Sequence, residues 1–293
     1  MGRDLIYFPN GNRATPSPRE LAAMTRRYYD PISRRLVYVG NAADAGYWDR
    51  HWTEFELESL LQDPPLNPHN RMILETTRRF LPEGSRILEG GCGLGDKVAL
   101  LQKGGFEVVG VDFAAETLTR IKAAAPHLDV HQEDVRALSF QDESFDGYWS
   151  LGVIEHFYRG YGEIRDEIFR VLKPGGILFL TFPSLSILRS LKAMLRIYPP
   201  WREEEGLIED FYQFALDPGT VRHDFEAHGF EFRAQRPLSG FKGLGDEIPL
   251  LDFPLRALYR LAYLPTEFVA GSFANHATLL VLTKRGHEDS LPA

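Results

Sequence analysis

The sequence predicts an α/β fold in which helices cover both faces of a mostly parallel sheet. Between Ser85 and Gly176, short β-branched runs alternate with helix-like stretches, a pattern typical of βαβ units. A turn made almost entirely of glycine joins the first strand of this region to its first helix. The 293 residues are 44% hydrophobic and 25% charged, a globular composition that excludes disordered, collagen-like and coiled-coil chains.

The expected elements follow in order along the chain. Strands are predicted at 86–89, 106–111, 128–131, 145–150 and 176–182, and two closing strands at 230–234 and 277–283. The first helix runs from Asp96 to the glycine pair at 104–105, because glycine adopts the positive φ that ends helices. Pro126 ends the second helix, 115–125, and Asp217 caps a third helix that reaches Gly229.

The rest of the chain is arranged around this core. Residues 1–82, rich in Tyr and Trp, are predicted to form an N-terminal helical cap, and 83–286 the core itself. Within the core, 184–216 and 239–275 are too long for simple connections, so we expect two lid insertions. The last residues, 287–293, have the composition of a flexible tail.

Composition limits the partners and the location. The single cysteine, Cys92, excludes a disulfide framework, and no Cys or His spacing resembles a metal site, so no metal is expected. The chain carries 33 basic and 41 acidic residues, a net charge of −8 that disfavours nucleic acid. The first residues lack a signal-peptide core, and no apolar run reaches the roughly 20 residues that span a bilayer. We therefore expect a cytoplasmic protein without a transmembrane segment.

The glycine turn predicts a bound polar or anionic ligand. Gly91, Gly93 and Gly95, preceded by Glu89, leave the backbone bare at the start of a helix, where amides can face a ligand. In the dinucleotide fingerprint G-x-G-x-x-G the third glycine comes one position later, so this spacing points away from NAD. The alternative is an ordinary tight turn, which rarely needs so many glycines.

Two acidic residues stand at the ends of the next strands. Asp112 follows the first glycines by about 20 residues, where a carboxylate can accept both hydroxyls of a ribose; the alternative is a helix cap. Asp134 can accept from an adenine amino group while the Val135 amide donates to the ring; the alternative is a solvated loop acid. Because parallel strands end at one edge of a sheet, these features together predict a nucleoside site.

Residues 86–181 resemble the core of the class I S-adenosylmethionine-dependent methyltransferases. The likeness is carried by 87–95 (ILEGGCGLG), 109–113 (VGVDF), 132–135 (QEDV), 145–157 (FDGYWSLGVIEHF) and 172–176 (LKPGG). It implies a Rossmann-like sheet of seven strands with the last one reversed, and S-adenosyl-L-methionine as cofactor. It further implies that Glu89, Gly91 and the Ser150-Leu151 backbone surround the methionine end of this cofactor and that Phe113 lies along the adenine.

On this resemblance we expect an enzyme that methylates a small molecule, at oxygen first and at carbon or nitrogen next. His156 is the candidate base beside the transferring methyl, and its alternative role is to shape the cofactor pocket. Tyr28, Tyr29 and Trp48 are candidate walls for an apolar or aromatic acceptor, and their alternative is core packing. The rival functions are a nicotinamide-dependent oxidoreductase and a non-catalytic S-adenosylmethionine-binding regulator.

The first insertion has an apolar face and a basic face at helical spacing. The apolar face contains Leu185, Ile187, Leu188, Leu191, Met194, Leu195 and Tyr198, and the basic face Arg189, Lys192, Arg196 and Arg202. One interpretation is a peripheral contact with a membrane or a lipid-like substrate. The other is a lid whose apolar face packs inward on its own core, the usual arrangement of an amphipathic helix.

Overall fold

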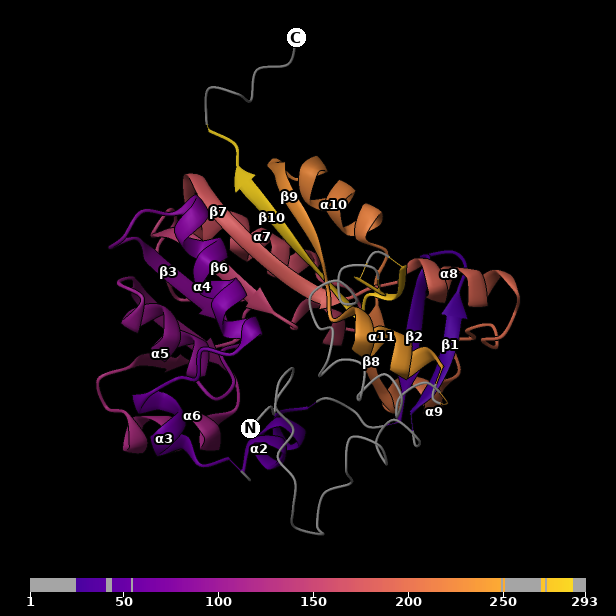
Figure 1. Cartoon of the computed structure of the whole chain (residues 1–293), viewed down its shortest axis with the longest axis horizontal. Helices are drawn as coiled ribbons and strands as arrows, with labels where there is room; N and C mark the ends of the chain where they lie inside the picture. Colours follow the sequence, from indigo (N-terminus) through magenta and orange to yellow (C-terminus); the bar gives the residue numbers. More distant parts are fainter. Residues whose placement is uncertain are drawn as a thin grey trace.

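The computed structural model describes residues 25–40, 44–53, 55–248, 250, 270–271 and 273–286. Its main sheet has seven strands in the order β5-β4-β3-β6-β7-β10-β9 (Figure 1). These are β3 (Arg86–Gly90), β4 (Glu107–Asp112), β5 (Asp129–Gln132), β6 (Phe145–Leu151), β7 (Leu172–Pro183), β9 (Phe230–Leu238) and β10 (Ala277–Lys284). The strands from β5 to β7 pair in parallel, whereas β10 runs antiparallel to both β7 and β9. The predicted Rossmann-like sheet with a reversed last strand is therefore confirmed.

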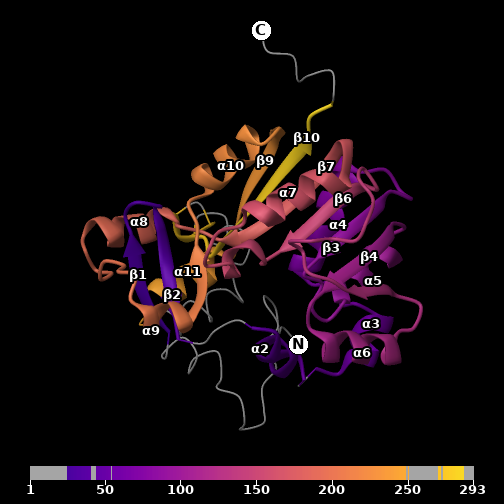
Figure 2. The same ribbon diagram turned by 180° about the vertical axis from the view of Figure 1, so that it is seen from behind.

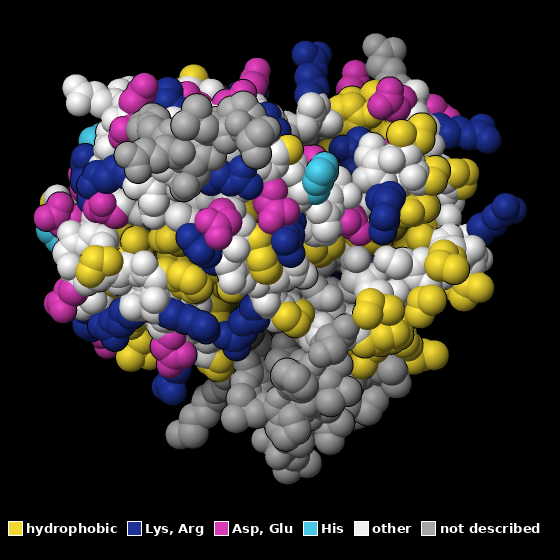
Figure 3. All heavy atoms as spheres, turned by 90° about the horizontal axis from the view of Figure 1, so that it is seen from above, with side chains coloured by type: hydrophobic (Ala, Val, Ile, Leu, Met, Phe, Trp, Pro, Cys, Tyr) yellow, Lys and Arg dark blue, Asp and Glu magenta, His cyan; other side chains and the backbone are white. Residues whose placement is uncertain are grey.

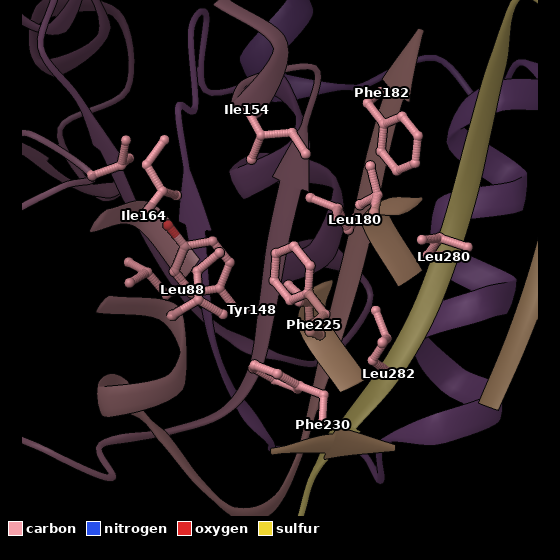
Figure 4. Packing of buried hydrophobic residues seen from close by; sticks show 14 of the residues in the cluster. Leu88, Tyr148, Ile154, Ile164, Leu180, Phe182, Phe225, Phe230, Leu280 and Leu282 are labelled. Atoms are coloured by element: carbon pink, nitrogen blue, oxygen red, sulfur yellow. The ribbon is translucent and has the colours of Figure 1, made fainter. Parts of the chain in front are cut away.

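Helices cover both faces of this sheet, as predicted. The helices over one face are α3 (Leu57–Gln62), α4 (Pro68–Phe80), α5 (Asp96–Lys103) and α6 (Ala115–Ala124), and those over the other are α7 (Gly162–Val171) and α10 (Pro218–Ala227). Side chains alternate along each strand, so Ile87 packs in the core on the side of α3 to α6 and Leu88 in the core on the side of α7 and α10. Figure 4 shows the core on the side of α7 and α10, where Leu88, Leu180 and Phe225 converge. This two-sided burial explains the nearly continuous apolar runs of the parallel strands.

A second, smaller sheet corrects the prediction of an all-helical N-terminal cap. β1 (Arg26–Asp30) and β2 (Arg35–Val39) form an antiparallel hairpin, and β8 (Phe211–Ala215) pairs with β2 as the third strand. The Asp30 carboxylate accepts hydrogen bonds from the N–H groups of Ile32 and Ser33 and so closes the hairpin turn. The helical prediction fails here because the hairpin is completed by a strand more than 170 residues away. After the hairpin, α2 (Ala45–Trp52), α3 and α4 are helices, as expected.

The described helices of the two insertions lie together beside the small sheet (Figures 1 and 2). The first contains α8 (Ile187–Met194), α9 (Glu205–Glu209) and β8, and the second contains α11 (Gly240–Glu247). Most of the second insertion after α11, and the predicted tail 287–293, lie outside the described residues. No helix in the described ranges is long and apolar enough to cross a bilayer.

The outward-facing apolar side of α8 overturns one expectation. Ile187, Leu191 and Met194 are 55%, 42% and 78% exposed, whereas Arg189 is buried. The interpretation that the apolar face of this insertion packs inward on its own core is therefore wrong for α8.

Candidate cofactor site and active site

The carboxyl ends of β3, β4 and β6 meet at one edge of the main sheet. In the strand register, Gly90 pairs with Val111 on one side and with Ser150 on the other. The glycine turn, Asp112 and the Ser150-Leu151 segment therefore begin at the same level of the sheet. This is the edge at which open α/β sheets bind ligands.

The glycines of the turn are required by its backbone conformation. Gly91, Gly93 and Gly95 have φ of +77°, +48° and +71°, in the left-handed region. A Cβ on Gly91 would also lie 2.5 Å from Val153 Cγ2, closer than a real contact allows. The turn between β3 and the helix that starts at Asp96 therefore has no side chain on Gly91, Gly93 or Gly95, and its neighbours pack close to the bare backbone.

Asp112 is held as an oriented acceptor. Its carboxylate accepts hydrogen bonds from the Gly93 N–H at 2.8 Å and from the Ala114 N–H at 3.0 Å. The N-cap residue of α6 is Ala114, so Asp112 is not the helix cap that the sequence left open. Burial raises the pKa of Asp112, and the backbone N–H groups that it accepts from oppose this rise. Each carboxylate oxygen keeps a second lone-pair direction with which it can accept from a ligand hydroxyl.

Two buried polar atoms beside this turn have no hydrogen-bond partner among the described residues. They are Glu89 Oε2 and Ser150 Oγ, both at the carboxyl ends of strands. Burial, and to a lesser degree the charge of Asp96, raise the pKa of Glu89 well above its ordinary value. An unsatisfied buried acceptor is costly, so these atoms fit a ligand that brings its own donors. These acceptors therefore fit the amino group of an amino acid at Glu89 and the hydroxyls of a ribose at Asp112.

Of the three residues expected at the adenine, some are free to contact a ligand and others are already engaged by protein groups. Phe113 is 40% exposed beside Asp112, so its ring is free to lie along a base. Asp134 is instead engaged by Arg136, whose Nη2 lies 2.6 Å from Oδ2 and whose Nε lies 3.0 Å from Oδ1. The hydrogen bond from Arg136 lowers the pKa of Asp134. The Val135 side chain is buried in the core, which leaves only its backbone for the predicted adenine contact.

His156 has the tautomer and the surroundings of a neutral base. Its Nδ1 lies 2.8 Å from the Tyr212 carbonyl oxygen, which can only accept, so Nδ1 carries the proton and Nε2 the lone pair. Burial lowers the pKa of His156 to about 4. The imidazole is therefore uncharged at neutral pH, and this carbonyl fixes its orientation.

An aromatic lid formed by α2 lies over this region. The Trp48 ring packs edge-on against His156 with centroids 5.1 Å apart, and a Cβ on Gly93 would lie 3.3 Å from Trp52. α2 is anchored to α6, because Asp49 accepts from the N–H and hydroxyl of Thr117 at 3.0 and 2.9 Å. One short helix thus spans from the glycine turn to the candidate base.

Of the three predicted acceptor-wall residues, the structure brings only Trp48 to His156. Tyr28 lies on β1, where it packs edge-on against Trp201 at 5.6 Å. Tyr29 donates its backbone N–H to the Pro199 carbonyl and packs in the core of the small sheet. Contact with an acceptor stays a prediction for all three.

Sequence reasoning missed two residues that surround His156. Tyr212, on β8, places its ring 5.3 Å from the imidazole, and nothing in its local sequence signalled this. Glu155 lies inside the quoted motif 145–157, where the resemblance implies only that the Glu155-His156 pair shapes the cofactor pocket. Its side chain is buried, its Oε2 has no partner among the described residues, and burial raises its pKa to about 8.

Glu155 predicts an unusual pH dependence of stability. Its folded pKa lies above its unfolded one, so the stability is fully present below about pH 4.5 and falls as the pH rises to about 8. Changing Glu155 to Gln removes this loss, and the variant should exceed the wild type by more than ~2 kcal/mol at pH 9 but not at pH 5. Urea unfolding at both pH values measures the difference. The same change at the exposed Glu163 is the control, and an equal response of both variants would refute the prediction.

The glycine turn, the oriented Asp112 and the orphaned Glu89 carboxylate lie at one edge of a Rossmann-like sheet, and their chemistry fits a nucleoside ligand. Residues 88–180 match the methyltransferase domain family. This match agrees with the resemblance to S-adenosylmethionine-dependent methyltransferases that the motifs indicated.

Relatives with assigned names agree with this domain. A probable S-adenosylmethionine-dependent methyltransferase of Mycolicibacterium smegmatis is 32% identical over 55% of this chain and 57% of its own length. The 2-methyl-6-phytyl-1,4-hydroquinone methyltransferase of Synechocystis is 38% identical over 48% of this chain and 49% of its own. The chain thus spans about half the length of these relatives. Among solved structures, the cyclase SpnF is 18% identical with a TM-score of 0.52, covering 84% of this chain and 98% of its own, which shows the shared fold alone.

Proposed function

We propose that this protein transfers a methyl group from S-adenosylmethionine to a small-molecule acceptor, at oxygen first and at carbon or nitrogen next. The observation that carries the proposal is the combination, at one sheet edge, of a bare glycine turn with the oriented acceptor Asp112 and the orphaned Glu89. The name of the Synechocystis relative, a hydroquinone methyltransferase, supports a small aromatic acceptor. The aromatic lid of α2 suits such a molecule.

Few side chains are needed for this chemistry. When bound, S-adenosylmethionine supplies a methyl group that is already activated on a sulfonium. The glycine turn, Glu89 and Asp112 hold and orient it, and the α2 lid excludes water. The lone pair on His156 Nε2 can take the proton of an acceptor hydroxyl. A small acceptor also agrees with the acidic net charge, which opposes a nucleic-acid substrate.

Two other functions make different predictions for the same site. A nicotinamide-dependent oxidoreductase would be stabilised against heat by NAD and not by S-adenosylhomocysteine. A regulatory protein would bind S-adenosylhomocysteine yet transfer no methyl group. Because the shared fold also occurs in a protein named as a cyclase, methyl transfer has to be measured directly.

The deciding experiment incubates the full-length protein with methyl-labelled S-adenosylmethionine and a small-molecule extract. We expect one extract compound to gain the label, and mass spectrometry then identifies it and the methylated atom. Calorimetric titration with S-adenosylhomocysteine runs in parallel. Binding without any labelled product would favour the regulator, and absence of binding would reject the proposed site.

His156 predicts a separable catalytic effect. Changing His156 to Gln should lower kcat for an oxygen acceptor by about 10²-fold and leave S-adenosylhomocysteine affinity within about twofold. Because the pKa of the wild-type imidazole is about 4, kcat should stay level from pH 8 down to about pH 5 and fall below that. Unchanged turnover with normal cofactor affinity would dismiss the base and leave the pocket-shaping role.

A further inference from the structure

α8 and the loop after it expose a row of large apolar side chains. Its members are Ile187 (55% exposed), Leu191 (42%), Met194 (78%), Leu195 (73%) and Ile197 (56%), and we call them the α8 patch. They lie at the outer edge of the molecule, beside the small sheet (Figures 1 and 2). Figure 3 shows hydrophobic side chains gathered along the side on which α8 lies in Figure 1. Apolar clusters of this kind on soluble proteins commonly mark an interaction surface.

The orientation of α8 is fixed by charges on its inner side. Arg189 is buried and donates from Nε to Glu247 Oε1 at 2.9 Å, and Lys192 Nζ lies 2.6 Å from Glu247 Oε2. Arg189 also donates to the Ser184 carbonyl at 2.7 Å. Rotating the apolar side inward would withdraw both cations from a buried carboxylate and leave that charge unpaired, which is strongly destabilising. The patch is therefore held outward by the fold.

The patch is also positively charged in an acidic protein. The stretch from Ile187 to Arg202 contains four basic residues and no acid, in a chain with a net charge of −8. Arg189 and Lys192 face inward to Glu247, which leaves Arg196 and Arg202 as the exposed cations of this stretch. Arg196 stands between two patch residues, and Arg202 follows them; both are exposed, and neither has an ion pair with any residue that the structure describes. Glu203, the next acid, accepts from the Tyr158 hydroxyl at 3.0 Å.

We infer that the α8 patch docks on a bilayer surface that contains anionic lipid. Apolar side chains enter the interface while neighbouring cations meet the phosphate groups, which is how peripheral amphipathic helices bind. A second copy of this chain is a poorer occupant, because pairing two patches would place Arg196 and Arg202 of each copy close to those of the other. The inference goes beyond the proposed function, since docking requires neither cofactor nor acceptor.

The test is co-sedimentation of the full-length protein with vesicles of phosphatidylcholine, with and without one third phosphatidylglycerol. We expect the wild type to bind the anionic vesicles at least about tenfold more tightly, and to lose this preference at high salt. Changing Leu191 and Met194 together to Glu should weaken binding by at least about tenfold. Changing Arg196 to Asn, which suits its φ of +55°, should weaken it severalfold and reduce the salt dependence.

A matched substitution outside the α8 patch serves as the control. Leu66, 61% exposed before α4, is changed to Glu as a matched substitution outside the patch and should bind as the wild type. Because all substituted side chains are exposed, each variant should melt within a few degrees of the wild type. Failure of the wild type to bind anionic vesicles overturns the inference, as does wild-type binding by the Leu191/Met194 variant. Self-association of the wild type without vesicle binding, abolished in that variant, would assign the patch to a second copy instead.

Discussion

Changing Asp112 to Ala should weaken the binding of S-adenosylhomocysteine by about 10³-fold. The wild-type carboxylate is oriented by the N–H groups of Gly93 and Ala114, so it meets a ribose without reorganisation. Two hydrogen bonds from ribose hydroxyls to a charged acceptor contribute ~1.5–3 kcal/mol each, and each 1.4 kcal/mol is tenfold in affinity. Isothermal calorimetry on the purified protein measures the change.

Two further variants separate the recognition of the ribose by Asp112 from the support that Asp112 gives to the glycine turn. Changing Asp112 to Asn keeps one acceptor for the Gly93 N–H but loses the charge, so its affinity should fall between those of the wild type and the Ala variant. Changing Asp134 to Asn should alter affinity less than about fivefold, because that carboxylate is half-exposed and already paired with Arg136. If the Asp112 Ala variant melts like the wild type and binds as tightly, Asp112 is not the ribose acceptor.

The sequence contained enough information to predict the core of the fold and to bring the candidate site residues to one edge of the sheet. Strands β3 to β6 and the helices between them are local units, in which period, glycine and proline determine where each element begins and ends. The left-handed φ of Gly91, Gly93 and Gly95 is a backbone requirement that only glycine meets easily, so the glycines in the sequence already predict this turn.

Features that depend on distant partners could not be predicted this way. The β1–β2 hairpin is completed by β8, and Tyr212 reaches His156 only because of that pairing. The prediction that the apolar face of α8 packs inward fails for the same reason, because Glu247, which binds the inner side of α8, is 58 residues beyond Arg189. Hydrophobic periodicity identified the two faces of α8, but which face turns inward depends on the charges that the fold buries beneath it.

Glu247 should be the most sensitive position for stability. Its carboxylate is 0% exposed and joins β1 and α8 to its own helix α11, because it accepts from Arg27 of β1 at 3.0 Å and from Arg189 and Lys192 of α8 at 2.9 and 2.6 Å. Changing Glu247 to Gln leaves these cations without a buried counter-charge and should cost ~3–5 kcal/mol of unfolding free energy. Chemical denaturation at pH 7 measures the loss, with Glu226 to Gln, in the partly exposed pair with Arg222 on α10, as a control expected to cost below ~1 kcal/mol.

The pH dependence of this network gives the prediction a second, independent readout. Burial alone would raise the pKa of Glu247, but Arg189 and Arg27 outweigh it and hold the pKa at about 2. A folded pKa below the unfolded one gives stability that is present above about pH 4.5 and is lost as the pH falls toward 2. The wild type should therefore lose stability across this window, while the Gln variant, already without the charge, should lose less. A Gln variant as stable as the wild type at pH 7, with the same acid response, would show that the hairpin, α8 and α11 are held together by their apolar contacts alone.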